Sequence, residues 1–213
     1  MRMSILLVGA ALGLAGCGGT TIPEADAVQG AAGGPGVTRV RVTENAPQPA
    51  LPNAAAVSTS ASNTGGSVSV DVGLPQGGGY AYEVDYTLAS ATTRAGLSAG
   101  IELSPMPSGG TASFVGVSDL TVVTGLGSGN NPSVTTTRSP FTVDIDFDDG
   151  SFSGSGGGLS VNGTFSDNTA SGTSTVAGLQ GTLDAVVASD QAIGIVTGAN
   201  SSFAYAGGFV AIE

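Results

Sequence analysis

The sequence predicts an all-β fold, a small antiparallel β-barrel of about eight strands, from three observations. Beyond Gly65, short runs of alternating apolar and polar residues are separated by Gly, Asn, Asp and Ser clusters, roughly every 8 to 15 residues. No stretch in this part has the apolar spacing of an amphipathic helix. Many of the 36 glycines fall inside the runs, where they allow tight curvature, and closure into a barrel removes exposed strand edges.

The chain begins with the pattern of a secretory signal peptide. Arg2 precedes an apolar run at residues 5–14, which is shorter than the roughly 20 residues that cross a bilayer but matches the apolar part of a signal peptide. The small pair Ala15 and Gly16 suits a cleavage site. We therefore expect residues 1–16 to be removed.

The sequence Leu-Ala-Gly-Cys at residues 14–17 resembles the lipobox of bacterial lipoproteins. The resemblance implies that the Cys17 thiol receives a diacylglycerol, that the chain is cut before this residue and that the new amine is acylated. The alternative is an ordinary signal peptide with a nearby cysteine, or a buried free thiol. Two or more acyl chains anchor a protein stably in a membrane. Because Gly18 and Gly19 stand where many inner-membrane lipoproteins carry an aspartate, the resemblance implies the outer membrane.

Residues 17–65 are expected to form a flexible tether between this lipid anchor and the folded domain. They are mainly Ala, Gly, Pro, Thr and Ser, and such a stretch buries too little apolar surface to offset the entropy lost on ordering. Residues 37–42 are the exception, because their valines are interspersed with polar residues, Arg39 and Arg41 among them, as in a half-buried strand. This segment either adds an edge strand to the domain or stays unpaired.

Residues 66–213 are predicted to form one barrel domain. Turns of the hairpin type are expected at Asp149-Gly150 and Asp167-Asn168, because these residues adopt the backbone angles of tight turns. They favour antiparallel pairing of strands that follow each other in the chain. The predicted strands are residues 67–72, 80–88, 98–103, 111–123, 141–147, 151–155, 159–165, 170–176, 181–188, 192–197 and 203–212.

Composition excludes several classes of function. The chain has no His and no Lys, and its only cysteine is the predicted lipidation site. It therefore lacks the usual general base, Schiff-base amine, thiolate nucleophile and imidazole metal ligand, so neither an enzyme nor a cofactor is expected. Removal of Arg2 leaves 4 cationic and 16 anionic side chains, a net charge of 4 − 16 = −12, which opposes binding to nucleic acids.

Several Gly-rich segments of the domain are similar to those of a known family. Residues 106–116, with the sequence MPSGGTASFVG, and residues 143–154, an acidic apolar strand that turns into Phe-Ser-Gly, are two of them. Gly-Thr-Leu at 181–183, Ala-Ile-Gly-Ile at 192–195 and Ala-Gly-Gly-Phe at 206–209 form a closing set. In this order, after a lipobox and a tether, they resemble the C-terminal barrel of transferrin-binding protein B-like surface lipoproteins.

This resemblance implies an eight-stranded barrel, held at the outer membrane on its tether, that binds a protein or small-solute ligand. The chain has neither a second lobe nor the bulky loop insertions with which the two-lobed receptors hold their partner, so transferrin is not the expected ligand. A structural envelope lipoprotein without a specific ligand is the alternative. The resemblance leaves open whether the domain faces the cell surface or the periplasm.

Two groups of side chains are candidate binding residues. Tyr80, Tyr82 and Tyr86 share one face of a predicted strand, where they form either a ligand-binding surface or part of the core. Asp144, Asp146 and Asp148 carry oxygen ligands suited to a hard cation. Their spacing matches no calcium-loop motif, so a solvated strand face is the main interpretation and no metal is assigned to them.

Overall fold

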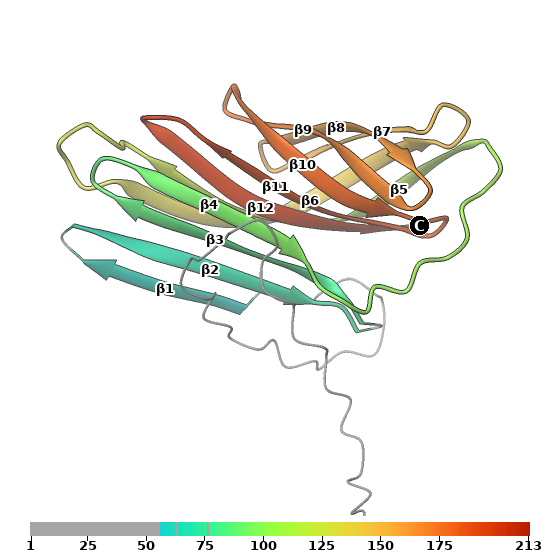
Figure 1. Cartoon of the computed structure of the whole chain (residues 1–213), viewed down its shortest axis with the longest axis horizontal. Helices are drawn as coiled ribbons and strands as arrows, with labels where there is room; N and C mark the ends of the chain where they lie inside the picture. The colour runs from blue at the N-terminus through green and yellow to red at the C-terminus, as the bar shows by residue number, and fades with distance from the viewer. Residues whose placement is uncertain (1–55, 63, 76) are drawn as a thin grey trace, which may run out of the picture.

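The computed structural model describes residues 56–62, 64–75 and 77–213, and within these ranges it is an all-β structure of twelve strands (Figure 1). The predicted signal peptide, Cys17 and the segment 37–42 lie outside the described residues. Within the described part, no helix is long and apolar enough to cross a membrane. The strands are β1 Ala56–Ser62, β2 Gly65–Gly73, β3 Gly79–Thr87, β4 Ala91–Leu97, β5 Thr111–Thr124, β6 Ser133–Asp146, β7 Ser151–Gly156, β8 Leu159–Ser166, β9 Thr169–Val176, β10 Leu179–Val187, β11 Gln191–Ala199 and β12 Phe203–Ile212.

The last eight strands close into an antiparallel barrel, which confirms the predicted fold class. Each strand from β5 to β11 pairs with the next in the chain, and β12 pairs with β5 to complete the ring. Closure runs over ten residue pairs, from Phe203 opposite Thr124 to Ile212 opposite Val115. The barrel therefore has no free strand edge.

The first four strands form a separate antiparallel sheet, in the order β1-β2-β3-β4, that lies along one side of the barrel (Figure 1). Its strands β2 and β3 correspond to the predicted strands 67–72 and 80–88. The barrel itself begins at Thr111 rather than directly after Gly65, and β1 begins at Ala56, inside the range assigned to the tether. Because β12 occupies the edge of β5, the barrel has no edge left with which the sheet could pair.

Three local differences separate the observed strands from the predicted ones. Residues 98–103 do not form a strand, whereas Ala91–Leu97 forms β4 by pairing with β3. β6 extends back to Ser133 through Pro140, because it pairs with β5 along fourteen residues.

The two predicted hairpin turns are confirmed, with left-handed φ angles of 63° at Gly150 and 52° at Asp167.

Aromatic and aliphatic side chains fill the barrel interior. Phe141 and Phe209 stack with ring centroids 4.8 Å apart, and Phe114 and Leu183 belong to the same buried cluster. Gly194 leaves room for this packing, since a Cβ at this position would lie 2.4 Å from ring atoms of Phe209. The interior is therefore a packed core.

A second core lies between the sheet and the outer surface of the barrel. β3 and β4 pack against β11 and β12, and Tyr80 and Tyr82 of β3 are fully buried there. We call the outward barrel residues beneath the sheet the covered wall: Val123, Ile193, Ile195, Ala204, Ala206 and Val210.

The opposite side of the barrel has outward residues of another kind. Along β7 to β9, the positions that alternate with the buried core are exposed or half-buried and polar. We call them the free wall: Ser151, Ser153, Ser155, Ser160, Asn162, Thr164, Ser171, Thr173 and Thr175.

Candidate functional site: a groove beside strand β4

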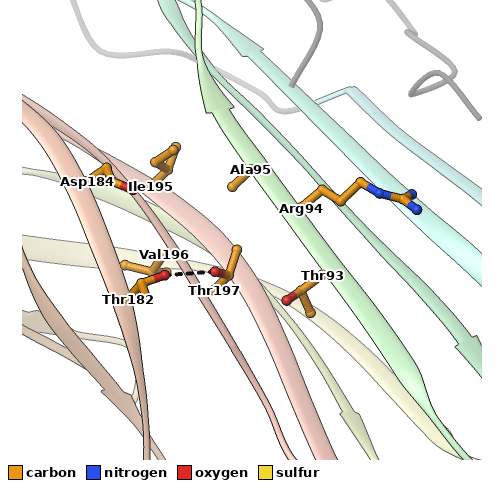
Figure 2. A pocket seen from close by; sticks show the side chains of 8 residues that line it. All are labelled: Thr93, Arg94, Ala95, Thr182, Asp184, Ile195, Val196 and Thr197. Atoms are coloured by element: carbon orange, nitrogen blue, oxygen red, sulfur yellow. Dashed lines mark hydrogen bonds between the residues drawn. The ribbon is translucent and has the colours of Figure 1, made fainter. Parts of the chain in front are cut away.

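A groove of about 210 Å³ separates the edge of the sheet from the barrel (Figure 2). Its sheet side is formed by β4, and its barrel side by β10 and β11. The residues that line it are Thr93, Arg94, Ala95, Thr182, Asp184, Ile195, Val196 and Thr197.

The backbone of β4 has an unpaired edge on the groove side. In the strand order of the described sheet, β4 pairs only with β3. The bond from the Ser98 amide to the Gly79 carbonyl, 3.0 Å, fixes the hydrogen-bonding phase of this pair. Since residues of an antiparallel ladder alternate between bonding inward and outward, Thr93 and Ala95 direct their N–H and C=O groups away from β3. The groove therefore offers hydrogen-bonding backbone groups to an added strand.

The walls of the groove combine apolar surface with a carboxylate. Ile195 and Ala95 supply aliphatic surface, and the hydroxyls of Thr182 and Thr197 lie 3.0 Å apart. Asp184 is exposed at the rim and is in no hydrogen bond or ion pair with another described residue. An extended segment that carries a positive charge would fit these groups.

Arg94 lines the groove with its backbone and turns its side chain away from it (Figure 2). Its Nη1 lies 3.1 Å from Oε2 of Glu83 and 2.5 Å from Oδ2 of Asp85, on the face of the sheet opposite the barrel. Burial, and then the neighbouring Asp85 carboxylate, raises the pKa of Glu83 above its usual value. The guanidinium is thus engaged outside the groove and leaves Asp184 as the charged side chain that faces it.

The candidates Tyr80 and Tyr82 share the barrel-facing side of β3 but have no exposed surface. The Tyr80 hydroxyl donates to Oδ2 of Asp119 at 2.8 Å, and the Tyr82 hydroxyl lies 3.3 Å from Oγ1 of Thr121. Burial raises the pKa of both phenols, and Asp119 adds to the rise. In this arrangement both side chains hold the sheet to the barrel, and a ligand could reach them only after the two separated.

Tyr86, the third tyrosine candidate, is half-buried at the end of β3. Its ring leans over Gly66 of β2, where a Cβ would lie 2.6 Å from the phenol oxygen. It borders a shallow depression with Ser60, Thr64 and other small polar residues of β1 and β2. The structure does not bring Tyr86 together with the β4 groove.

The acidic candidates lie at the far end of β6. Asp144 and Asp146 border a shallow depression on the outside of the barrel, and Asp148 follows in the turn. Oδ1 of Asp146 accepts the backbone N–H groups of Asp148 and Asp149 at 2.9 and 3.1 Å, so it stabilises the turn. No cluster of three or more metal-ligating side chains occurs within the described residues.

Sequence reasoning missed the β4 groove. The segment Ala91–Leu97 has no regular alternation, and Asp184 stands alone among small residues of β10. A usable signal was present in β11 and β12, whose nearly continuous apolar runs are typical of strands that are buried on both faces. That signal predicts a second layer over these strands, and hence a boundary between layers.

Comparison with known proteins gives similarities of structure. No protein-family model matches the chain, and no curated protein matches its sequence. The fold is similar to transferrin binding protein B of Haemophilus parasuis, with 15% identity over 74% of this chain and 36% of that one and a TM-score of 0.48. The fold is also similar to isotype 1 transferrin binding protein B of serogroup B Neisseria meningitidis, with 9% identity over 80% of this chain and 36% of that one and a TM-score of 0.49.

A third similar structure is a surface lipoprotein, with 12% identity over 78% of this chain and 99% of that one and a TM-score of 0.45. The chain spans 36% of the length of each of the two transferrin-binding proteins. At identities this low, the similarity does not assign the ligands of these proteins to this chain.

Proposed function

We propose that this chain is an outer-membrane lipoprotein, anchored through Cys17, whose sheet and barrel bind a protein ligand without catalysing a reaction. The lipobox-like residues 14–17 support the anchor, and the absence of His and Lys supports a non-enzymatic role. The observation that carries the binding function is the outward backbone edge of Thr93 and Ala95 beside the Asp184 carboxylate.

The ligand that fits the groove is an extended, basic segment of a protein. An added strand bonds to the free edge of a sheet through its backbone, and pockets beside that edge select its side chains. Ile195 and Ala95 offer contact to an apolar side chain, and Asp184 offers an ion pair to a lysine or arginine. The chain's net charge of −11 favours the approach of such a ligand over an acidic one.

The anchor is tested by metabolic labelling with a fatty acid. The wild-type chain should incorporate the label and be processed before residue 17, whereas a Cys17→Ser variant should remain unlabelled and unprocessed. Normal processing of this variant would contradict lipidation. Protease treatment of intact cells then shows whether the domain faces outward.

The groove is tested with a fluorescent octapeptide in which lysine and valine alternate. Saturable binding is expected, and Asp184→Asn should weaken it about tenfold, the scale of one ion pair that is partly removed from water. Thr93→Pro removes an outward N–H group without breaking the β3–β4 ladder, since edge positions tolerate proline, and it should weaken binding at least as much.

Thr93→Val is the matched control, because it keeps the backbone N–H and a side chain of similar size. It should bind the peptide as the wild type does. If the peptide does not bind, or binds all three variants equally well, the groove is not the binding site, and the alternative of a structural envelope lipoprotein gains weight.

A further inference from the structure

The face of the four-stranded sheet that points away from the barrel is acidic. We define this acidic face by Ser69 and Asp71 of β2, Ala81, Glu83 and Asp85 of β3, and Arg94 of β4, which the strand register places side by side. The barrel strands β11 and β12 pack on the opposite face, through residues such as Tyr80 and Tyr82.

Three residues of the acidic face are buried, although the barrel packs on the opposite face of the sheet. Ser69, Ala81 and Glu83 are only 4%, 2% and 4% exposed. Neighbouring strands shield a side chain laterally, but Ala81 lies opposite Gly96, which has no side chain to cover it. The strand residues beside Ala81 therefore do not account for its burial.

The charges of this face favour a cationic cover. Arg94 is shared between Glu83 and Asp85, and Asp71 adds a third carboxylate to the same face. Because Glu83 is buried, a second positive charge close to it would offset part of the cost of removing its carboxylate from water.

The source of that charge follows from the few cationic residues of the chain. Once Arg2 is removed, Arg39, Arg41, Arg94 and Arg138 remain. Arg94 is already on the acidic face, and Nη1 of Arg138 lies 3.7 Å from Oδ2 of Asp119, the carboxylate that accepts from Tyr80. The two arginines that are left stand two residues apart, as Glu83 and Asp85 do, and this spacing puts side chains on one side of an extended chain.

The connecting chain is long enough for this contact. Residues 43–55 link the arginine pair to β1, and a chain of this length reaches roughly 40 Å when extended. Four strands span only about 15 Å from edge to edge. Every position on the acidic face is therefore within reach of residues 37–42.

We propose that residues 37–42 of the chain dock on the acidic face, with Arg39 and Arg41 against the carboxylates of Glu83, Asp85 and Asp71. This contact goes beyond the proposed ligand binding and does not depend on it. It shortens the free tether to residues 18–36, and it fixes the outer side of the sheet toward the anchored end of the chain. The β4 groove, at the edge of the sheet next to the barrel, is not part of this contact.

Trypsin tests this proposal on the full chain purified in detergent, since the chain contains no lysine and is cut only at its arginines. Cleavage after Arg39 and Arg41 should be at least about tenfold slower in the wild type than in a Glu83→Gln/Asp85→Asn variant. About 0.5 M salt, which screens charge over a few ångströms, should accelerate cleavage of the wild type. The readout is the same whether or not Cys17 carries lipid.

Asp144→Asn/Asp146→Asn is the matched control, because it removes two carboxylates at the same spacing from the barrel. It should leave cleavage after Arg39 and Arg41 slow. Intact bonds after Arg94 and Arg138 show that each protein is folded. If the Glu83→Gln/Asp85→Asn variant (the sheet variant) is cut at these bonds, the effect of salt on wild-type cleavage after Arg39 and Arg41 tests the proposal instead. The proposal would be overturned if the wild type were cleaved after Arg39 and Arg41 as fast as the sheet variant. It would also be overturned if this cleavage were slow but unaffected by salt and by the Glu83→Gln/Asp85→Asn change, or if it became fast only when the groove residue Asp184 was changed.

Discussion

The covered wall and the free wall are outward faces of the same closed barrel, yet they differ in almost every residue. The covered wall carries Ile193, Ile195 and Val210 beneath the sheet, whereas the free wall carries Ser, Thr and Asn in contact with solvent. The inward positions of both are similarly apolar or small. The difference teaches that barrel closure depends on the inward residues, while the outward residues determine which side accepts a second layer.

The largest expected effect comes from placing a charge on the covered wall. Ile193→Asp buries an unpaired carboxylate under the sheet and should lower the free energy of unfolding by about 4 kcal/mol or more. Thr173→Asp makes the same kind of change on the free wall and should stay within about 0.5 kcal/mol. Urea unfolding of both variants measures the contrast, and similar losses would mean that the sheet does not cover Ile193.

A smaller effect is expected from the hydrogen bond that links the two layers. Tyr80→Phe keeps the ring but removes the donor to Asp119, which leaves a buried carboxylate without this partner and should cost about 2 kcal/mol. Tyr86→Phe, at the half-buried end of β3, should cost less than about 0.5 kcal/mol. Denaturant midpoints at constant slope test this, and equal losses in the two variants would contradict a role for Tyr80 in holding the layers together.

The same interface should make stability depend on pH. Burial raises the pKa of Asp119, although the Tyr80 hydrogen bond and Arg138 act in the other direction. A carboxyl that binds its proton more tightly in the folded state stabilises the fold at low pH. This contribution is lost as pH rises from about 3.9, the unfolded value, through the raised folded pKa. Glu83 acts in the same direction.

Thermal unfolding between about pH 4 and 7 should therefore show a wild-type midpoint that falls as pH rises. Asp119→Asn removes one of the two groups and should flatten this dependence, while Asp144→Asn on the barrel surface should not change it. An unchanged slope in the Asp119 variant would rule out this carboxyl as a source of the dependence.

The smallest effect is expected where the free wall loses a hydroxyl. Thr173→Ala removes an exposed group and should change the free energy of unfolding by no more than about 0.5 kcal/mol. Chemical denaturation measures it. A loss above 1.5 kcal/mol would show that the hydroxyl ladders of the free wall stabilise the barrel, and the contrast between the walls would then be weaker than we infer.

Much of the barrel could be predicted from the sequence, because local signals coincide with the fold. The turns at Asp149-Gly150 and Asp167-Asn168 fix two hairpins, and the alternation of Phe141, Val143 and Ile145 fixes the inward face of β6. In this barrel every strand pair except β12–β5 joins strands that follow each other in the chain. Turn residues and local alternation are then nearly sufficient to predict how the barrel strands pair.

The separate sheet and its groove could not be predicted in the same way. Alternation of Val68, Val70 and Val72 shows that one face of the strand is buried, but it does not tell what buries it. Likewise, Tyr80 and Tyr82 satisfy the pattern of a binding surface as well as that of a core, and only their contacts with Asp119 and Thr121 distinguish the two. These contacts join residues 39 positions apart in the chain.

The pairing of β12 with β5 also sets the order in which the fold is completed. Because a chain is synthesised from its N-terminus, the sheet is made first and Phe203–Ile212 last. Until those ten residues arrive, the barrel stays open and Tyr80 and Tyr82 lack the surface against which they pack. The apolar side of the first strands therefore stays exposed until the last strand is in place.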